Sequence, residues 1–310
     1  MNQPKTTSNL SRRRFLTGVA ATAAAAVAFP HLAFGQAKKR KLVMIAGKPS
    51  HPAGMHEFNA GVYVLSQCLK AVPDLEVSVH RNHWVSDEKV LDDADALFIY
   101  SDGRQGHPAV QGDHKEKVAK LMARGVGLMC AHYAVEVDPK QAGDEFKAWI
   151  GGHYEHEFSV NPIWEPKFET FPNHPISRGV KPFTAKDEWY FNMRFRPEMK
   201  GVTSILTATP SDAVRDGPYV YPKGPYKHIQ EAKGRVETMM WAVEREDGGR
   251  GVGFTGGHFH TNWGIDDFRK VVLNALLWIS KVEVPANGLE SKLPEGELLK
   301  NLDPKAAPKK

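Results

Sequence analysis

The hydrophobic pattern of the first half alternates between short apolar runs and longer segments with helical periodicity. Between the runs, residues 57–71 and 110–124 carry apolar side chains three and four positions apart, which is typical of helices that cover a sheet. Strands that are apolar on both faces and separated by helices indicate a parallel sheet covered on both sides. We therefore predict an α/β fold with a doubly wound, mostly parallel, flavodoxin-like sheet. The predicted strands of this half are residues 41–47, 76–79, 95–101 and 125–132.

The second half is less regular. Residues 158–171 alternate loosely between apolar and polar positions, which favours added antiparallel strands. Residues 203–209 and 236–243 predict two further strands, and a last buried strand at 250–255 precedes a helix at 266–279.

An insertion at residues 210–234 separates two of these strands and contains several prolines and glycines with three tyrosines, Tyr219, Tyr221 and Tyr226. A loop this long is uncommon inside a domain and is often functional. Tyrosine faces suit the C–H patches of sugar rings, so the insertion is either a lid over a sugar site or a loop that packs on its own domain.

The N-terminus predicts export. The sequence SRRRFL and an Ala-rich apolar run at 18–28 are followed by small residues, with a cleavage site near Gly35 or Ala37. Adjacent arginines in this setting match the twin-arginine address, so we predict the Tat export machinery as a partner and a periplasmic or secreted protein. An uncleaved anchor or an ordinary Sec signal is the alternative.

The charge and length of the chain after the predicted signal peptide indicate its partners and its number of domains. The net charge of +5 includes four bases and no acid within residues 1–35, so the rest carries about +1, and the basic balance implies no nucleic-acid partner. No later segment is long and apolar enough to be an integral membrane span. We expect one α/β domain over residues 36–280, after a signal peptide at 1–35, and a polar C-terminal tail at 281–310.

Histidines follow most of the predicted strands. The chain has 14 of them, and every strand end except the second delivers one within a few residues. In an open parallel sheet, ligands bind outside the carboxyl ends of the strands. Histidines far apart in sequence are thus expected to meet at one edge of the sheet. The residues at these ends are His56, Asp102 with His107, His132, and His258 with His260.

Imidazole and carboxylate groups together favour Zn²⁺ or a similar divalent metal, which in catalytic sites takes three protein ligands. We predict His56, His132 and His258 as these ligands. A metal-free polar cleft, whose histidines only donate hydrogen bonds, is the alternative interpretation.

Several segments, taken in order, resemble the ThuA-like family, named for trehalose utilisation, and they cover roughly residues 41–280. The resemblance implies a fold similar to class I glutamine amidotransferases and a link to sugar or glycoside catabolism. The segments are HPAGMHEF at 51–58, GVGLMCAH at 125–132, WIGG at 149–152, HPISRG at 174–179, DEWY at 187–190, and GRG at 249–251 leading to Gly257 and His258.

The sequence departs from the amidotransferase pattern at the nucleophile. His132 occupies the turn after the fourth strand, and Cys130 lies two residues earlier in an apolar strand, where a thiol is inert. Two residues after His258 stands His260 rather than an acid. A Cys-His-Glu triad is therefore disfavoured. Cys130 and Cys68 are expected to be buried free thiols, although a disulfide between them is not decided by sequence.

We therefore predict an exported, metal-assisted enzyme of carbohydrate utilisation, with hydrolase- or isomerase-type acid–base chemistry on trehalose, a glycoside or a keto-sugar. A non-catalytic sugar-binding protein and a thiol hydrolase using Cys130 are the alternatives. The predicted catalytic residues are His132, His258, Glu188 and Asp102. The predicted substrate-binding residues are His260, Tyr133, Trp263 and His107.

Overall fold

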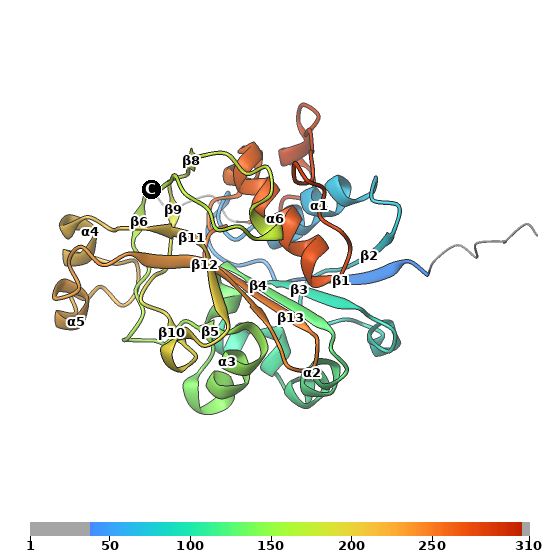
Figure 1. Ribbon diagram of the computed structural model, residues 1–310, viewed down its shortest axis with the longest axis horizontal. Helices are drawn as coiled ribbons and strands as arrows, with labels where there is room; N and C mark the ends of the chain where they lie inside the picture. The colour runs from blue at the N-terminus through green and yellow to red at the C-terminus, as the bar shows by residue number, and fades with distance from the viewer. Residues whose placement is uncertain (1–37, 306–310) are drawn as a thin grey trace, which may run out of the picture. The chain divides into compact units, whose positions relative to one another are not determined.

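A computed structural model describes residues 38–305, so the predicted signal peptide and its cleavage site lie outside the described residues. Its centre is a seven-stranded sheet in the order β11-β12-β13-β4-β3-β1-β2 (Figure 1). The five strands from β2 to β13 are parallel, and β12 and β11 continue the sheet antiparallel. The strands are β1 (Arg40–Ala46), β2 (Leu75–His80), β3 (Ala96–Tyr100), β4 (Gly127–Ala131), β11 (Val202–Ala208), β12 (Glu237–Glu244) and β13 (Arg250–Phe254).

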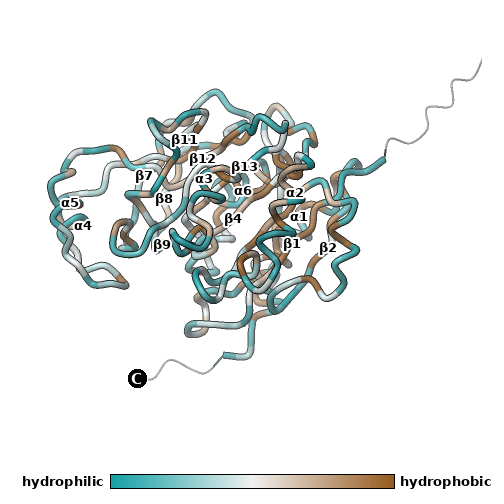
Figure 2. Tube along the Cα trace, turned by 90° about the horizontal axis from the view of Figure 1, so that it is seen from below, coloured by the Kyte–Doolittle hydropathy of each residue, from teal (hydrophilic) through white to brown (hydrophobic). Residues whose placement is uncertain are grey.

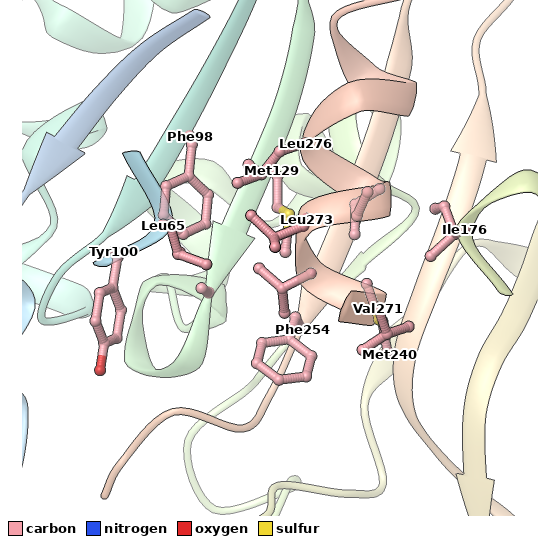
Figure 3. Packing of buried hydrophobic residues seen from close by; sticks show 14 of the residues in the cluster. Leu65, Phe98, Tyr100, Met129, Ile176, Met240, Phe254, Val271, Leu273 and Leu276 are labelled. Atoms are coloured by element: carbon pink, nitrogen blue, oxygen red, sulfur yellow. The ribbon is translucent and has the colours of Figure 1, made fainter. Parts of the chain in front are cut away.

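Helices cover both faces of the sheet, as the apolar strands predict. Side chains of β1 alternate between the two layers: Leu42 and Met44 pack with α1 and α6, whereas Val43 and Ile45 pack with α2 and α3. Figure 1 shows these helix pairs on opposite sides of the sheet, and Figure 3 shows Leu273 and Leu276 of α6 packed over the strands. The helices are α1 (Phe58–Leu69), α2 (His114–Ala123), α3 (Asp144–Ile150), α4 (Asp212–Asp216), α5 (Lys227–Gln230) and α6 (Asp266–Ile279).

The irregular second half adds short antiparallel pairs, as predicted for residues 158–171. Pairs form between β6 and β9, β7 and β8, and β5 and β10. Figure 2 shows the apolar strands at the centre of the domain, with α4 and α5 of the 210–234 insertion on the side away from α1 and β2. The short strands are β5 (Gly152–His153), β6 (Ile163–Trp164), β7 (Lys167–Phe168), β8 (Phe183–Thr184), β9 (Asp187–Glu188) and β10 (Arg194–Phe195).

The segment expected to be a polar tail lies against the domain up to residue 305. The Asp303 backbone N–H donates to Glu57 Oε2 at 2.9 Å, and Lys305 Nζ donates to the His56 carbonyl at 3.0 Å. The Lys305 amine also lies 3.3 Å from Glu57 Oε1, with both side chains almost fully buried. These contacts hold the loop between β1 and α1.

Between residues 38 and 305, no helix combines the length and apolar character needed to cross a bilayer.

Candidate functional site

Three histidines and a glutamate meet at the carboxyl edge of the parallel strands. His56 lies in the loop after β1, His132 is the first residue after β4, and His258 follows β13. Glu188 arrives from outside the main sheet, on the short strand β9. All four side chains are buried, and one ligand atom from each lies within 4.8 Å of the others.

The imidazoles face one another through nitrogen atoms. His56 Nε2 lies 2.9 Å from His258 Nδ1 and 3.0 Å from His132 Nε2, and the last two atoms are 3.3 Å apart. Glu188 Oε2 lies 2.7 Å from His258 Nδ1 and 3.6 Å from His132 Nε2. The Tyr190 hydroxyl is 3.2 Å from His132 Nε2.

The outer nitrogens fix which inner nitrogens carry lone pairs. His132 Nδ1 donates to the Thr255 carbonyl at 2.9 Å, so in the neutral ring Nε2 has no proton. His56 Nδ1 lies 3.0 Å from Asp102 Oδ1, and donation to that carboxylate likewise leaves Nε2 bare. Two lone pairs thus face each other across 3.0 Å. Such a pair is repulsive unless a hydrogen-bond donor or a cation lies between them, and a metal ion would satisfy both nitrogens at once.

Burial favours the neutral form of the His56 and His132 rings. Loss of solvent lowers the pKa of His132 well below its ordinary value, and the nearby His56 and His258 lower it further. The pKa of His56 is also lowered, chiefly by burial and then by His51 and His258. Neutral imidazoles are the form that binds metals, so this environment favours coordination over protonation.

The donor set fits a divalent metal. In a tetrahedral zinc site with bonds of about 2.0–2.1 Å, neighbouring ligand atoms are roughly 3.3 Å apart, close to the spacing of the three nitrogens. Three histidines with one glutamate could therefore hold such an ion, with Asp102 orienting His56 from outside, as second-layer carboxylates do.

The backbone at this edge is held in unusual conformations. His56 and His132 both have positive φ, 47° and 54°, in the left-handed region that non-glycine residues rarely occupy. Such strain persists where surrounding contacts impose it, and it is common at functional sites. The His56 N–H donates to the His258 carbonyl at 3.0 Å, which ties the first strand end to the last.

Asp187 fixes the turn that carries His258. Its carboxylate accepts the backbone N–H groups of Gly257, His258 and Phe259 at 2.7, 3.0 and 3.2 Å. Gly257 has φ 110°, which a residue with a side chain could adopt only under strain. The two buried acids of β9 therefore have different roles. Asp187 binds backbone N–H groups of the turn, and Glu188 faces the imidazoles.

The cluster opens into a cavity of about 220 Å³. Three tyrosines on its wall, Tyr133, Tyr190 and Tyr221, come from three different segments. Tyr221, from the predicted insertion, is 64% exposed, whereas Tyr219 of the same insertion is buried. Larger hollows of about 510 and 750 Å³ occur elsewhere in the described part of the chain, and neither is lined by a histidine.

Three of the predicted substrate-binding residues do not line this cavity. His107 is fully buried: its Nδ1 accepts the Ala109 N–H, and its Nε2 contacts the Ala134 carbonyl at 2.9 Å. Both nitrogens of His107 thus contact backbone groups. His260 Nε2 donates to the Leu298 carbonyl, and Trp263 packs in the core against Tyr100.

Sequence reasoning missed Glu136, His51 and Tyr190. Glu136 lines the cavity and is buried; its only sequence signal is a lone acid inside an otherwise apolar run. His51 stacks on His56, with ring centroids 3.6 Å apart. Tyr190 follows Glu188 by two residues, so a longer β9 would have predicted a shared face.

Cys130 does not belong to this site. It lies within β4 in the apolar layer that includes Val118 and Phe146, and burial raises the pKa of its thiol. Cys68 and Cys130 are both free thiols, so they do not form a disulfide with each other. The thiol-hydrolase alternative thus has no accessible thiolate at this position.

An open α/β sheet with a histidine-rich edge defines the class of this protein. Residues 43–279 match the family model described as ThuA, trehalose utilisation, and the chain belongs to this family. A search of curated proteins gives no match.

Two solved structures are similar in fold. A ThuA-like protein from Bacteroides uniformis ATCC 8492 is 14% identical, with a TM-score of 0.51 over 79% of this chain and 93% of its own. A ThuA-like protein from Parabacteroides merdae ATCC 43184 is 15% identical, with a TM-score of 0.51 over 83% and 94%. These similarities support the ThuA-like α/β fold.

Proposed function

We propose that the protein is an exported, metal-assisted enzyme that acts on a small carbohydrate, either trehalose, another glycoside or a keto-sugar derivative. One observation carries the proposal: bare nitrogens of His56 and His132 face each other at 3.0 Å beside Glu188, and His56 and Glu188 of this cluster line a cavity. A divalent metal held there would act as a Lewis acid toward a sugar oxygen or water.

The chain's own residues supply the rest of the chemistry. Asp102 orients the His56 ring, and the Thr255 carbonyl orients His132. Asn161 donates to Glu188 Oε1 at 2.8 Å, so the other carboxylate oxygen is free to face the histidines. Tyr133 and Tyr221 offer aromatic faces to a sugar, and the family's link to trehalose utilisation supports this substrate class.

Metal analysis and turnover test the proposal together. Protein purified without chelator should contain about one equivalent of a divalent metal, and should convert trehalose, a simple glycoside or the corresponding keto-sugar. Metal content and turnover that both stay unchanged after His132→Ala and His258→Ala would overturn it.

Export is a separate part of the proposal. Replacement of both Arg12 and Arg13 by lysine should retain the protein inside the cell, because the twin-arginine receptor reads the arginine pair. Unchanged export of the double variant would favour an ordinary Sec signal.

A non-catalytic sugar-binding protein is the second candidate, and the exposed Tyr221 ring on the cavity wall favours it. That alternative predicts sugar binding that Tyr221→Ala weakens and that the histidine variants leave intact, without any turnover.

A further inference from the structure

Glu136 is a buried carboxyl group on the wall of the histidine-lined cavity. Its side chain is 9% exposed, and its Oε1 atom has no hydrogen-bond partner. Arg104 Nε forms only a long ion pair with Oε1 at 3.8 Å, and His156 Nδ1 lies equally far away, so neither group is within hydrogen-bond distance. Buried carboxylates are normally paired, because an unpaired one is costly to desolvate. Glu136 is therefore hard to explain as a structural residue.

The backbone around Glu136 is tightly held. The Arg104 N–H donates to the Glu136 carbonyl at 3.0 Å. A Cβ at Gly103 would lie 2.7 Å from that same carbonyl oxygen, so only glycine allows the loop to approach this closely. Arg104 itself has a positive φ of 50°. The loop after β3 thus positions the Glu136 segment while leaving its carboxyl oxygen unpaired.

The surroundings of the carboxyl group favour its protonated form. Burial raises the pKa of Glu136 from 4.5 to about 8, Arg104 lowers it, and Glu188 raises it. The other polar groups in range are uncharged tyrosines and one partly exposed histidine. They are Tyr133, Tyr154, Tyr190 and His156.

We propose that Glu136 is the proton donor of this cavity, acting on the leaving oxygen of a glycoside as its carbon–oxygen bond breaks. This inference rests on the proposed function. The electron pair of the broken bond stays on the departing oxygen, which takes the proton of Glu136 and leaves as a hydroxyl. Water adds to the carbon and releases one proton, which returns to the Glu136 carboxylate. One water is consumed, and both products carry a hydroxyl group.

The leaving group provides the sharpest test. Glu136→Gln should lower kcat/KM roughly 100- to 10,000-fold on an alkyl glycoside, whose leaving oxygen needs a proton. The loss should be much smaller on the matching nitrophenyl glycoside, whose phenolate departs unprotonated. Glu295→Gln, which replaces an exposed glutamate outside the cavity, is the matched control and should change neither rate. Metal content should be the same in all three proteins.

Two readouts do not depend on activity. In metal-free wild-type protein, the infrared carbonyl band of protonated carboxylic acids should contain a component that disappears with a midpoint near pH 8, and Glu136→Gln should lack that component. The folded carboxyl holds its proton above pH 4.5, where the unfolded one has lost it, so this group opposes folding increasingly as pH rises toward 8. Glu136→Gln should therefore raise Tm relative to wild type at pH 8 more than at pH 5.

The outcomes separate the two proposals. If wild-type protein turns over glycosides and Glu136→Gln stays within about threefold on both substrates, the role of Glu136 is wrong while the enzyme assignment stands. An equal loss on both substrates also overturns proton donation. If wild-type protein holds no metal and turns over neither glycoside, both proposals fall.

Discussion

The histidine cluster and the Glu136 region share one cavity but are built in opposite ways. In the cluster, His56 and His132 each have an outer nitrogen engaged by a carboxylate or a carbonyl, so the orientation of each ring is fixed. Glu136, by contrast, has a buried oxygen that contacts no donor. Fixed rings suit coordination, because a metal needs lone pairs held in place. A buried carboxyl without a hydrogen-bond donor suits proton exchange, because burial outweighs the charge of Arg104 3.8 Å away and raises the pKa of the group.

The histidine cluster and Glu136 also differ in how they affect the stability of the fold. A cation should stabilise the cluster, since it would bind the lone pairs of His56 and His132 that face each other at 3.0 Å. Glu136 is costly when ionised, because no cation lies within hydrogen-bond distance of its Oε1 atom, and this cost grows as pH rises. A bound metal should therefore raise the free energy of unfolding of the protein. The ionised Glu136 carboxyl group should lower it.

Removal of one central ligand should give the largest effect. His132→Ala deletes the nitrogen that faces both His56 and His258, and we expect loss of bound metal and a fall in turnover of at least roughly 1,000-fold. Elemental analysis and steady-state kinetics measure both. His114→Ala, at the start of α2 and outside the cluster, should keep the metal. A metal-loaded His132→Ala protein would contradict the coordination assigned here.

Metal removal should destabilise the fold. A chelator should lower Tm by roughly 5–10 °C, which corresponds to about 2.7 kcal/mol for a metal present at about 100 times its Kd. Readdition of the ion should restore the original value in calorimetry. The His132→Ala variant should show no response to either treatment, and a response of the same size there would place the metal elsewhere.

Loss of the outer carboxylate should weaken the site without abolishing it. Asp102→Asn removes the acceptor of the His56 Nδ1 proton, and we expect metal affinity to fall about 10- to 100-fold. Competition with a chromogenic chelator measures this. Asp74→Asn, at an exposed position before β2, is the control. Equal affinities for both variants would mean that Asp102 does not orient the ring.

The C-terminal contact should give the smallest change. Lys305→Ala removes the amine that donates to the His56 carbonyl and pairs with Glu57, at a cost of about 1–3 kcal/mol in local stability. Faster amide exchange in residues 51–57 should report this loosening, together with a few-fold weaker metal affinity. Lys300→Ala, which breaks a separate pair with Glu297, should leave that loop unchanged.

The parallel core was predictable because each strand is a continuous apolar run. Such runs locate β1, β3, β4 and β13 to within two residues, and the rule for carboxyl ends of parallel strands then brings His56, His132 and His258 to one edge. The antiparallel additions were predictable only as a class. A strand as short as β9 has too few positions for any periodicity, so the contact of Glu188 with His258 could not be inferred from spacing.

Histidine position alone does not distinguish a ligand from a cap. His107 and His132 both follow buried strands, yet His107 uses its two nitrogens on backbone groups and His132 uses only one. That difference depends on which backbone groups lie nearby in space. Glu136 was not predicted for a similar reason, because the burial of an acid depends on tertiary contacts that the sequence pattern does not reveal.

The contacts of Asp303 and Lys305 with the β1–α1 loop can form only late in synthesis. Asp303 and Lys305 leave the ribosome after all seven strands of the sheet, yet they hold the loop that presents His56. The nascent chain can therefore assemble its layers before this corner is secured. We therefore expect the His56 loop to be the last part of the histidine cluster to reach its final position.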